Sequence, residues 1–245
     1  MVLKVPNCVN IGYDALSLSY NPEERTVMAL YHGVEDWDRL LRLLKSKLHL
    51  CFHPMFIPTA LFSCHRYHLG RYRGVVDANI YRTEHQIGYA IPGHLEQVRP
   101  EASNERLDVL EVDYESIVRR LHSYQTELAT MANVGRFSKD CGDSLIQMIR
   151  ELEIYSPFKD DERFHSSGEE ILHGIEFSRS LTFTLLSQTQ SLKERVQSQT
   201  NLVSSAKLSF LGHAKELKTN SCFKLLDLQS DQPRRQQDRP LNSRT

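Results

Sequence analysis

Six side chains of the kinds that bind metal ions fall close together in the first half of the chain. They are His49, Cys51, His53, Cys64, His65 and His68. A structural zinc site needs cysteines or histidines in pairs at short, regular spacings. The two cysteines here stand alone among apolar neighbours, where a thiol usually packs as a small hydrophobic group. The spacing therefore predicts core and surface residues in this segment, and no metal site.

A second chemically suggestive segment is 65–73, HRYHLGRYR, in which arginines are interleaved with tyrosines. This combination can contact phosphates and stack on bases. Nucleic-acid binders usually carry a basic domain, whereas this chain has 30 basic and 31 acidic residues and a formal net charge of -1. We therefore expect Arg66, Arg71 and Arg73 to be solvated around a tight turn at Gly70. No nucleic-acid partner is predicted.

The common catalytic motifs are missing from the sequence, which contains no phosphate-binding glycine loop, no Gly-x-Ser-x-Gly and no His-Glu-x-x-His. Tyr114 and Tyr124 lie in an apolar helical stripe and are expected to be core aromatics with the hydroxyl at the rim. The prediction is that the chain is not an enzyme, with no catalytic, cofactor-binding or metal-binding residues.

Cysteine usage and hydropathy indicate a soluble, cytoplasmic protein. The five cysteines are odd in number and widely spaced, so a disulfide framework is not expected. The N-terminus lacks the apolar run of a signal peptide. The most apolar stretch, 48–64, is interrupted by Pro54 and Pro58, whereas a membrane span needs about 20 apolar residues in a row. No membrane span is predicted.

The first half is predicted to contain short elements. Residues 1–33 suggest a few strands, and residues 35–45, EDWDRLLRLLK, predict a helix with acids first and bases last. Its apolar face contains Trp37, Leu40, Leu41 and Leu44. The nearly apolar segment 49–62 predicts a buried, kinked piece. Residues 70–104, rich in glycine and proline, predict irregular structure with a strand near 78–81.

The second half has strong helical periodicity. From residue 107 to residue 131, apolar side chains recur at steps of three and four. The stretch 133–135 predicts a stop, and a second helix is expected to run from there to Pro157. These two helices would form a hairpin. The charges beside the apolar stripe do not form a coiled-coil pairing code, which favours packing within a bundle.

A third helix is predicted to start at Ser167, which can cap the helix with Glu170 three residues later. It should continue past Val196 toward Leu202. Its predicted inward face is Ile171, Ile175, Leu181, Leu185, Gln188, Leu192, Val196 and Gln199. The polar far end of this face predicts a neighbour, so self-association or contact with other helices is expected through residues 105–203.

The predicted fold class is α+β, mainly helical. A small mixed or irregular N-terminal part covers residues 1–104, and a helical hairpin with a long stalk-like helix covers residues 105–203. Residues 204–245 are expected to be a poorly ordered tail, because helical patterning fades there and 229–245 contain one large apolar residue.

Three segments occur in an order that resembles the cytosolic part of fungal proteins related to the CorA magnesium transporters. They are LLRLLKSKLHLCFHPMFIPTALF, the helical pair 107–155, and EILHGIEFSRSLTFTLLSQTQSLKERVQSQTNLV. The likeness covers roughly residues 35–203 and depends mainly on the HP…P…LF segment and on Leu192, Arg195, Gln197 and Gln199. The resemblance implies an α/β domain, a stalk helix and a homo-oligomer that transports divalent cations, with magnesium as the expected ion.

The sequence departs from that family after Val203, since neither membrane helices nor a Gly-Met-Asn motif follow. The resemblance therefore implies an oligomerising or ion-responsive module that is not a transporter by itself. The alternative is a helical protein-protein interaction protein with no ion chemistry. We also hypothesise that the family's stalk is cut off near Val203 and replaced by an unrelated tail, which sequencing of the spliced transcript would test.

Overall fold

The structure is a computed structural model that describes residues 1–6, 13–33, 37–87, 113–158 and 160–230; side chains are described up to Ser205, except that of Tyr114. Contacts between residues divide the chain into a unit Met1–Thr200 and a unit Asn201–Thr245. A three-stranded sheet precedes a set of helices, so the predicted α+β, mainly helical fold class is confirmed.

The sheet contains β1 (Val2–Pro6), β2 (Tyr13–Asn21) and β3 (Thr26–His32) in the order β1-β2-β3, with both pairings antiparallel. The turn between β2 and β3 is closed by Asn21, whose side-chain oxygen accepts a hydrogen bond from the Glu23 amide at 3.0 Å. Val5 and Leu16 are buried on the inner face. The short strands expected in residues 1–33 are confirmed.

Two short helices connect the sheet to the bundle. Helix α1 (Trp37–Ser46) confirms the predicted helix and buries Leu40, while Trp37 is half exposed and stacks on Tyr31. The 3-10 helix η1 (Leu48–Phe52) follows. The expected buried, kinked piece is therefore this η1 turn and the start of α2, where His53 and Met55 are buried.

Helix α2 (Phe56–Gln86) contradicts two predictions made from the sequence. The predicted turn at Gly70 and the predicted strand near 78–81 are both wrong, because the chain is helical through residue 86. Leu69, Val76 and Ile80 are each fully buried at helical spacing, so core packing outweighs the glycines that suggested irregular structure. Pro58 is tolerated because it lies in the first turn, where its missing N–H is not needed. Residues 88–104 lie outside the described residues.

Helix α3 (Tyr114–Tyr155) is one helix where the sequence suggested two. Asp113 caps it by accepting hydrogen bonds from the amides of Glu115 and Ser116, both at 3.1 Å. The expected stop at 133–135 is wrong because Gly135 lies in a close approach of α3 to Leu186. The helical hairpin is consequently formed by α3 and the following helix. Leu107 and Leu110, at the start of the predicted stripe, are not described.

Helix α4 (Glu162–Ser230) begins five residues before the predicted cap at Ser167. Asp161 provides the cap, since its carboxylate accepts from the Arg163 amide at 3.0 Å. Ser167 lies inside the helix, and its hydroxyl donates to the backbone oxygen of His49 at 3.3 Å. The backbone of residues 204–230 is also helical, whereas the sequence predicted poor order from residue 204; residues 231–245 are not described.

The buried stripe of α4 differs from the predicted one at its middle. Between residues 171 and 199 its members are Ile171, Ile175, Ser178, Thr182, Leu185, Thr189, Leu192, Val196 and Gln199. Gln188, predicted to face inward, is exposed, and Leu181 is only partly buried. Thr182 and Thr189 can be buried because their hydroxyls donate to helix carbonyls four residues back, at 3.0 and 2.8 Å.

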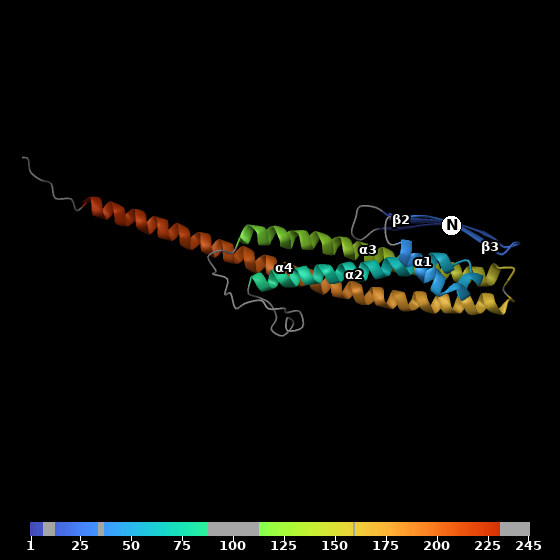
Figure 1. The fold of residues 1–245 in the computed structure, drawn as a ribbon. Coiled ribbons are helices and arrows are strands. Elements are labelled where there is room, and N and C mark those ends of the chain that lie inside the picture. Colours follow the sequence, from blue (N-terminus) through green and yellow to red (C-terminus); the bar gives the residue numbers. More distant parts are fainter. Residues whose placement is uncertain (7–12, 34–36, 88–112, 159, 231–245) are drawn as a thin grey trace, which may run out of the picture. The chain divides into compact units, whose positions relative to one another are not determined.

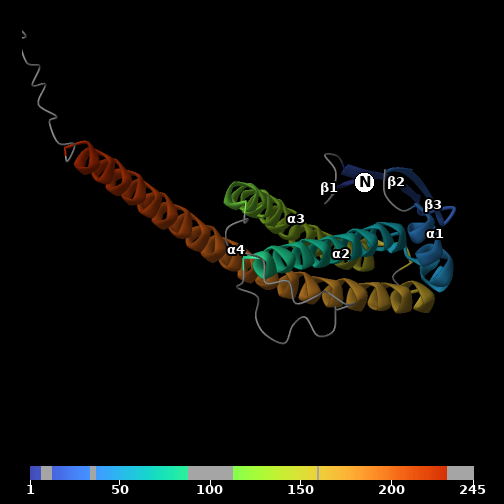
Figure 2. The same ribbon diagram turned by 60° about the vertical axis from the view of Figure 1, so that its left-hand side comes forward.

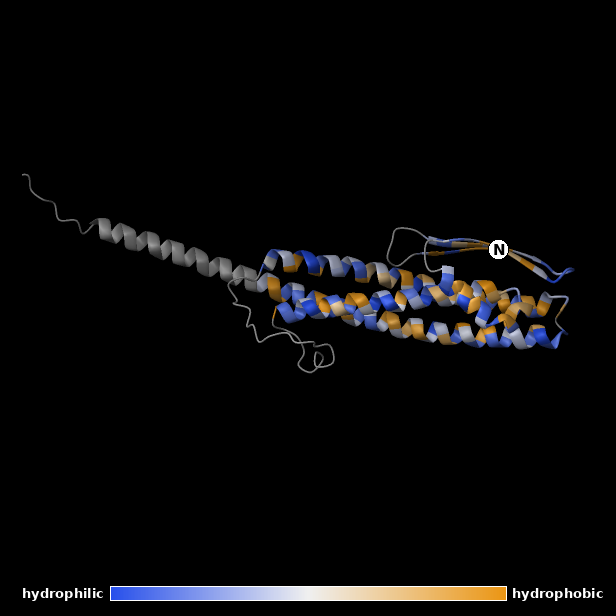
Figure 3. Ribbon diagram, viewed as in Figure 1, coloured by the Kyte–Doolittle hydropathy of each residue, from blue (hydrophilic) through white to orange (hydrophobic). Residues whose placement is uncertain are grey.

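Within Met1–Thr200, helices α2, α3 and α4 lie side by side and the sheet lies against one side of the bundle (Figures 1 and 2). The main core draws side chains from η1 and these three helices, including Phe62, Leu145, Ile149 and Ile175. A second cluster joins the sheet to α2 through Val5, Leu16 and Leu61. Hydrophobic residues gather where these elements meet (Figure 3).

Candidate functional site

A network of four charged side chains connects α2 to α4, and we call Arg73, Asp77, Glu84 and Arg195 the charge network. Arg73, Asp77 and Glu84 lie at steps of four and seven along α2, so the helix places them on one side. Arg195 comes from α4, 111 positions after Glu84. The network therefore holds a long-range contact in place.

Glu84 is the buried centre of the charge network. Its side chain is 3% exposed, and Arg195 binds both carboxylate oxygens, with Nη2 at 2.6 Å from Oε2 and Nε at 3.2 Å from Oε1. The third guanidinium nitrogen lies 3.4 Å from Asp77, which also contacts Arg73 at 3.4 Å. These carboxylates raise the pKa of Arg195, with the hydrogen bonds to Glu84 as the largest cause.

Polar contacts continue on both sides of the charge network. The hydroxyls of Thr83 and Tyr124 lie 3.3 Å apart between α2 and α3, as expected for an aromatic residue with its hydroxyl at the rim. The Gln125 amide donates to Gln197 at 3.0 Å, which joins α3 to α4. Of the four residues that carry the family resemblance, Arg195 and Gln197 thus contact neighbouring helices, and Leu192 and Gln199 are buried.

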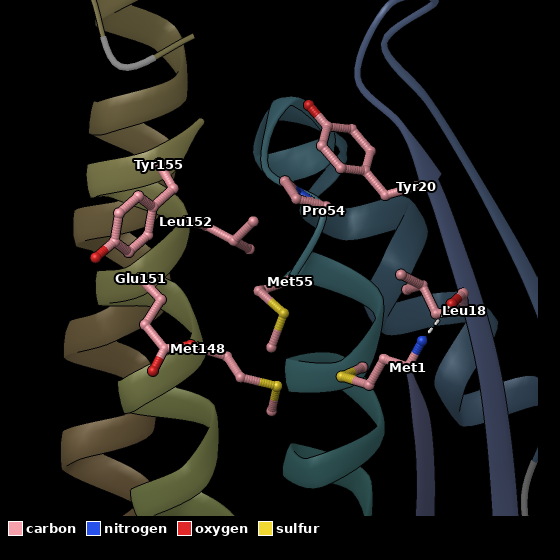
Figure 4. A pocket seen from close by; sticks show the side chains of 9 residues that line it. All are labelled: Met1, Leu18, Tyr20, Pro54, Met55, Met148, Glu151, Leu152 and Tyr155. Atoms are coloured by element: carbon pink, nitrogen blue, oxygen red, sulfur yellow. Dashed lines mark hydrogen bonds between the residues drawn. The ribbon is translucent and has the colours of Figure 1, made fainter. Parts of the chain in front are cut away.

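A methionine-lined pocket of about 360 Å³ lies between the sheet, the start of α2 and the end of α3 (Figure 4). Its lining is Met1, Leu18, Tyr20, Pro54, Met55, Met148, Glu151, Leu152 and Tyr155. The side chains of Met1, Met55 and Met148 point into this space. Methionine adapts its shape to apolar partners, and Glu151 is the only carboxylate in the lining. The pocket can therefore hold an apolar group.

The six residues first considered as metal ligands lie in separate places. His49 is exposed in η1 and contacts Glu170 at 3.0 Å, and Cys51 is exposed as a free thiol. His53 is buried against the Phe164 ring, with centroids 4.7 Å apart, and Cys64 and His65 are buried within α2. His68, in the same helix, is half buried, and its ring lies edge-on to that of Tyr67. Within the ranges that the structure describes, no three His, Cys, Asp or Glu side chains gather as a metal site.

The segment HRYHLGRYR is helical and only partly solvated. Arg66 is half buried, and loss of solvent lowers its pKa. The guanidinium of Arg39, in α1, lies over the Tyr67 ring at 3.3 Å from its centroid. Arg73 belongs to the charge network. Arg66 and Arg73 therefore contribute to helix packing, whereas Arg71 is exposed as the sequence predicts. The predicted turn is replaced by a helix.

Glu84 and Asp77 were not identified from the sequence, because residues 70–104 were expected to be irregular. The signal was nevertheless present: an acid at residue 77 and another at residue 84 are seven apart, with Arg73 four residues earlier. This spacing places all three on one helix side. What no local pattern contains is the identity of the distant partner, Arg195.

Comparison with known proteins yields no match to a protein-family model, a curated protein or a solved structure. In the parts of the chain that the structure describes, no helix combines the length and the apolar character of a membrane span.

Proposed function

We propose that this chain is a self-associating, ion-responsive helical module, related to the cytosolic part of CorA-like magnesium transporters but not a transporter by itself. The observation that carries the proposal is the length of α4, which runs from Glu162 to Ser230. Its residues 201–230 belong to the second unit, and they are the only described element of that unit. A helix that has no other element of its own unit beside it needs a partner.

The sequence of this part of α4 provides an apolar stripe for such a partner. The stripe is weak in the sequence because two alanines and a serine belong to it, but along a helical backbone its members recur at steps of three and four: Val203, Ala206, Phe210, Ala214, Leu217, Ser221, Leu225 and Leu228. An isolated helix draws most of its stability from packing such a stripe against another element. A second copy of the same helix supplies a matching stripe.

The proposed relation to CorA-like proteins rests on a sequence motif, part of which forms contacts of α4 inside the first unit. Arg195 and Gln197, two of the residues in the family-like motif, bind α2 and α3 through side-chain hydrogen bonds. The motif residues are thus used to seat a long helix on a bundle. The proposed magnesium response rests on the family resemblance alone. This response distinguishes the proposal from the alternative, a helical interaction protein with no ion chemistry.

Sedimentation velocity of the full chain, with and without millimolar magnesium, tests the proposal. We expect an oligomer, and a change in its sedimentation or its melting temperature with magnesium, since a ligand that prefers the folded state raises that temperature. The variant Leu217→Glu with Leu225→Glu should lose the oligomer that forms through α4. The matched control, Ser205→Glu with Thr219→Glu, adds the same two charges away from the stripe and should leave the oligomer intact.

Two results would count against the proposal. A wild-type chain that remains monomeric at every concentration would exclude self-association. An oligomer that magnesium leaves unchanged, in both size and melting temperature, would favour the alternative of a helical interaction protein.

A further inference from the structure

Strand β3 is an edge strand that exposes apolar side chains. Met28 and Leu30 are 72% and 74% exposed, although each lies in the middle of the strand. Ala29, which is on the other face of the sheet, is exposed as well. An uncovered edge of this kind is a template for pairing with another strand.

The alternation of hydrogen bonds along β2 shows which peptide groups of β3 point away from the sheet. Leu18 donates its amide hydrogen to Met1 and accepts a hydrogen bond from the Met1 amino group, both at 2.8 Å, so its peptide groups face β1. Its neighbours Ser17 and Ser19 therefore face β3, where they are opposite Leu30 and Met28. By the same alternation, the N–H and C=O groups of Val27 and Ala29 point away from the sheet.

Nothing in the described part of the chain occupies these outward groups. No backbone hydrogen bond outside the regular elements involves Val27 or Ala29. The other edge of the sheet differs, because β1 contains the exposed charge of Lys4 and the proline Pro6. Both residues are features that normally prevent strands from pairing at an edge. Strand β3, with the sequence TVMALYH, has no proline and no acidic, lysine or arginine side chain.

We infer that β3 pairs with β3 of a second copy of this chain, antiparallel and with Met28 on the two-fold axis. In this register Val27 of each copy lies opposite Ala29 of the other, and the two pairs exchange four hydrogen bonds. Met28 faces its own equivalent, and Leu30 lies diagonally beside it on the exposed face. Because the strand carries no formal charge, the pairing brings no like charges together. A proline-containing peptide would lose one of the backbone hydrogen bonds, and a charged peptide would place its charge beside the apolar side chains of β3.

The strand contact is small, and it is separate from the proposed contact of α4. Five residues from each copy bury much less than the roughly 1,200–2,000 Å² of a stable specific interface. The predicted dimer is consequently weak, and a covalent trap is the sharpest way to detect it. The contact uses residues of the first unit only, so it can be present or absent whether or not α4 self-associates.

Cysteine trapping in the full chain tests the inference. In the proposed register the two copies of residue 28 form a non-hydrogen-bonded pair with Cα atoms about 4.5 Å apart, which a disulfide can span. The variant Met28→Cys should form a disulfide-linked dimer under mild oxidation, read on a non-reducing gel and located by peptide mass spectrometry. Leu30→Cys is the matched control, because it is equally exposed but lies opposite Thr26 and should not form this dimer.

The trapping is carried out in the wild-type chain and in the Leu217→Glu, Leu225→Glu variant. The comparison separates the contact through β3 from the contact through α4. Persistence of the Met28→Cys dimer in both backgrounds supports pairing through β3 alone. A Met28→Cys dimer no more abundant than that of Leu30→Cys would overturn the inference. As a second measurement without cysteine, Met28→Lys should abolish the concentration-dependent dimer that remains once α4 is blocked, whereas Val2→Lys on the opposite edge should not.

Discussion

At the scale of single residues, Glu84 is a buried carboxylate held by one partner. Removing a carboxylate from water costs several kcal/mol unless its oxygens are bound by a partner, and here the Arg195 guanidinium binds both. The pair therefore specifies how α4 sits on α2 more than it adds net stability. Replacing both residues with apolar ones should change the free energy of unfolding little, whereas replacing only one of them should lower it strongly.

Arg195→Met should lower the free energy of unfolding by about 3 kcal/mol, because it leaves the Glu84 charge buried without its partner. Urea unfolding at pH 7 measures the loss. Combining Arg195→Met with Glu84→Leu should restore most of it. The control is Arg119→Met, which breaks an exposed pair with Glu115 and should change stability by no more than about 0.5 kcal/mol. Equal effects of the two arginine variants would show that Glu84 does not depend on Arg195.

At the scale of elements, α2 shows how packing outweighs local preference. Gly70 and Gly74 lie in the middle of a long helix, and an added Cβ would meet nothing within 4 Å at either position. These glycines are therefore not required by a close approach. They weaken the helix, which forms because Leu69, Val76 and Ile80 are buried in the core.

Gly74→Ala should stabilise the protein by about 0.5–1 kcal/mol, since alanine is the better helix former and there is space for its methyl group. Thermal unfolding followed by circular dichroism measures the gain. Gly142→Ala is the comparison: its Cβ would lie 3.3 Å from the Phe62 ring and 3.8 Å from Ile175, so packing strain should cancel part of the same gain. A loss of stability in Gly74→Ala would contradict the account of α2.

The elements also show where sequence reasoning succeeds. The strands, α1 and the periodic helices were predicted, because alternation and the three-four repeat report local geometry directly. The predictions of irregular structure at residues 70–86 and of a helix stop at 133–135 are wrong. Glycine suggests a break in the helix at both places, but tertiary packing stabilises the helix. The stripe of α4 was misplaced at Gln188 because Thr189, buried with its hydroxyl bonded to Leu185, looks polar in the sequence.

The candidate site was predicted only in part, for a related reason. The sequence singles out Arg195 only as a residue that carries the family resemblance, with no site role, and it does not single out its partner Glu84. A contact between residues more than a hundred positions apart is decided by how whole helices pack, and no local pattern carries that information. The open edge of β3 was equally hidden, since strand order and hydrogen-bond phase become known only from the assembled sheet.

At the scale of the whole molecule, one core joins η1, α2, α3 and α4, so the unit Met1–Thr200 is expected to unfold cooperatively. Two of the described histidines of this unit are buried. His53 and His65 are 1% and 6% exposed, and their Nε2 atoms have no partner among the described residues. Burial lowers the pKa of His53 to about 4, and burial together with the His68 charge lowers that of His65 to about 4.

Stability should therefore fall as the pH drops from about 6.5 toward 4. Above pH 6.5 both histidines are neutral in the folded and the unfolded chain; below it, the unfolded chain takes up protons and the folded chain does not, at a cost of about 3 kcal/mol per histidine by pH 4. Urea unfolding at pH 7, 6 and 5 measures the slope. His65→Leu should reduce it by about half, whereas His122→Leu, at an exposed position, should not. The pKa values of Asp143 and Glu170 are also lowered, from ordinary values of 3.8 and 4.5, so these carboxylates affect the slope mainly below pH 5. An unchanged stability between pH 7 and 5 would mean that both histidines are accessible to protons in the folded state.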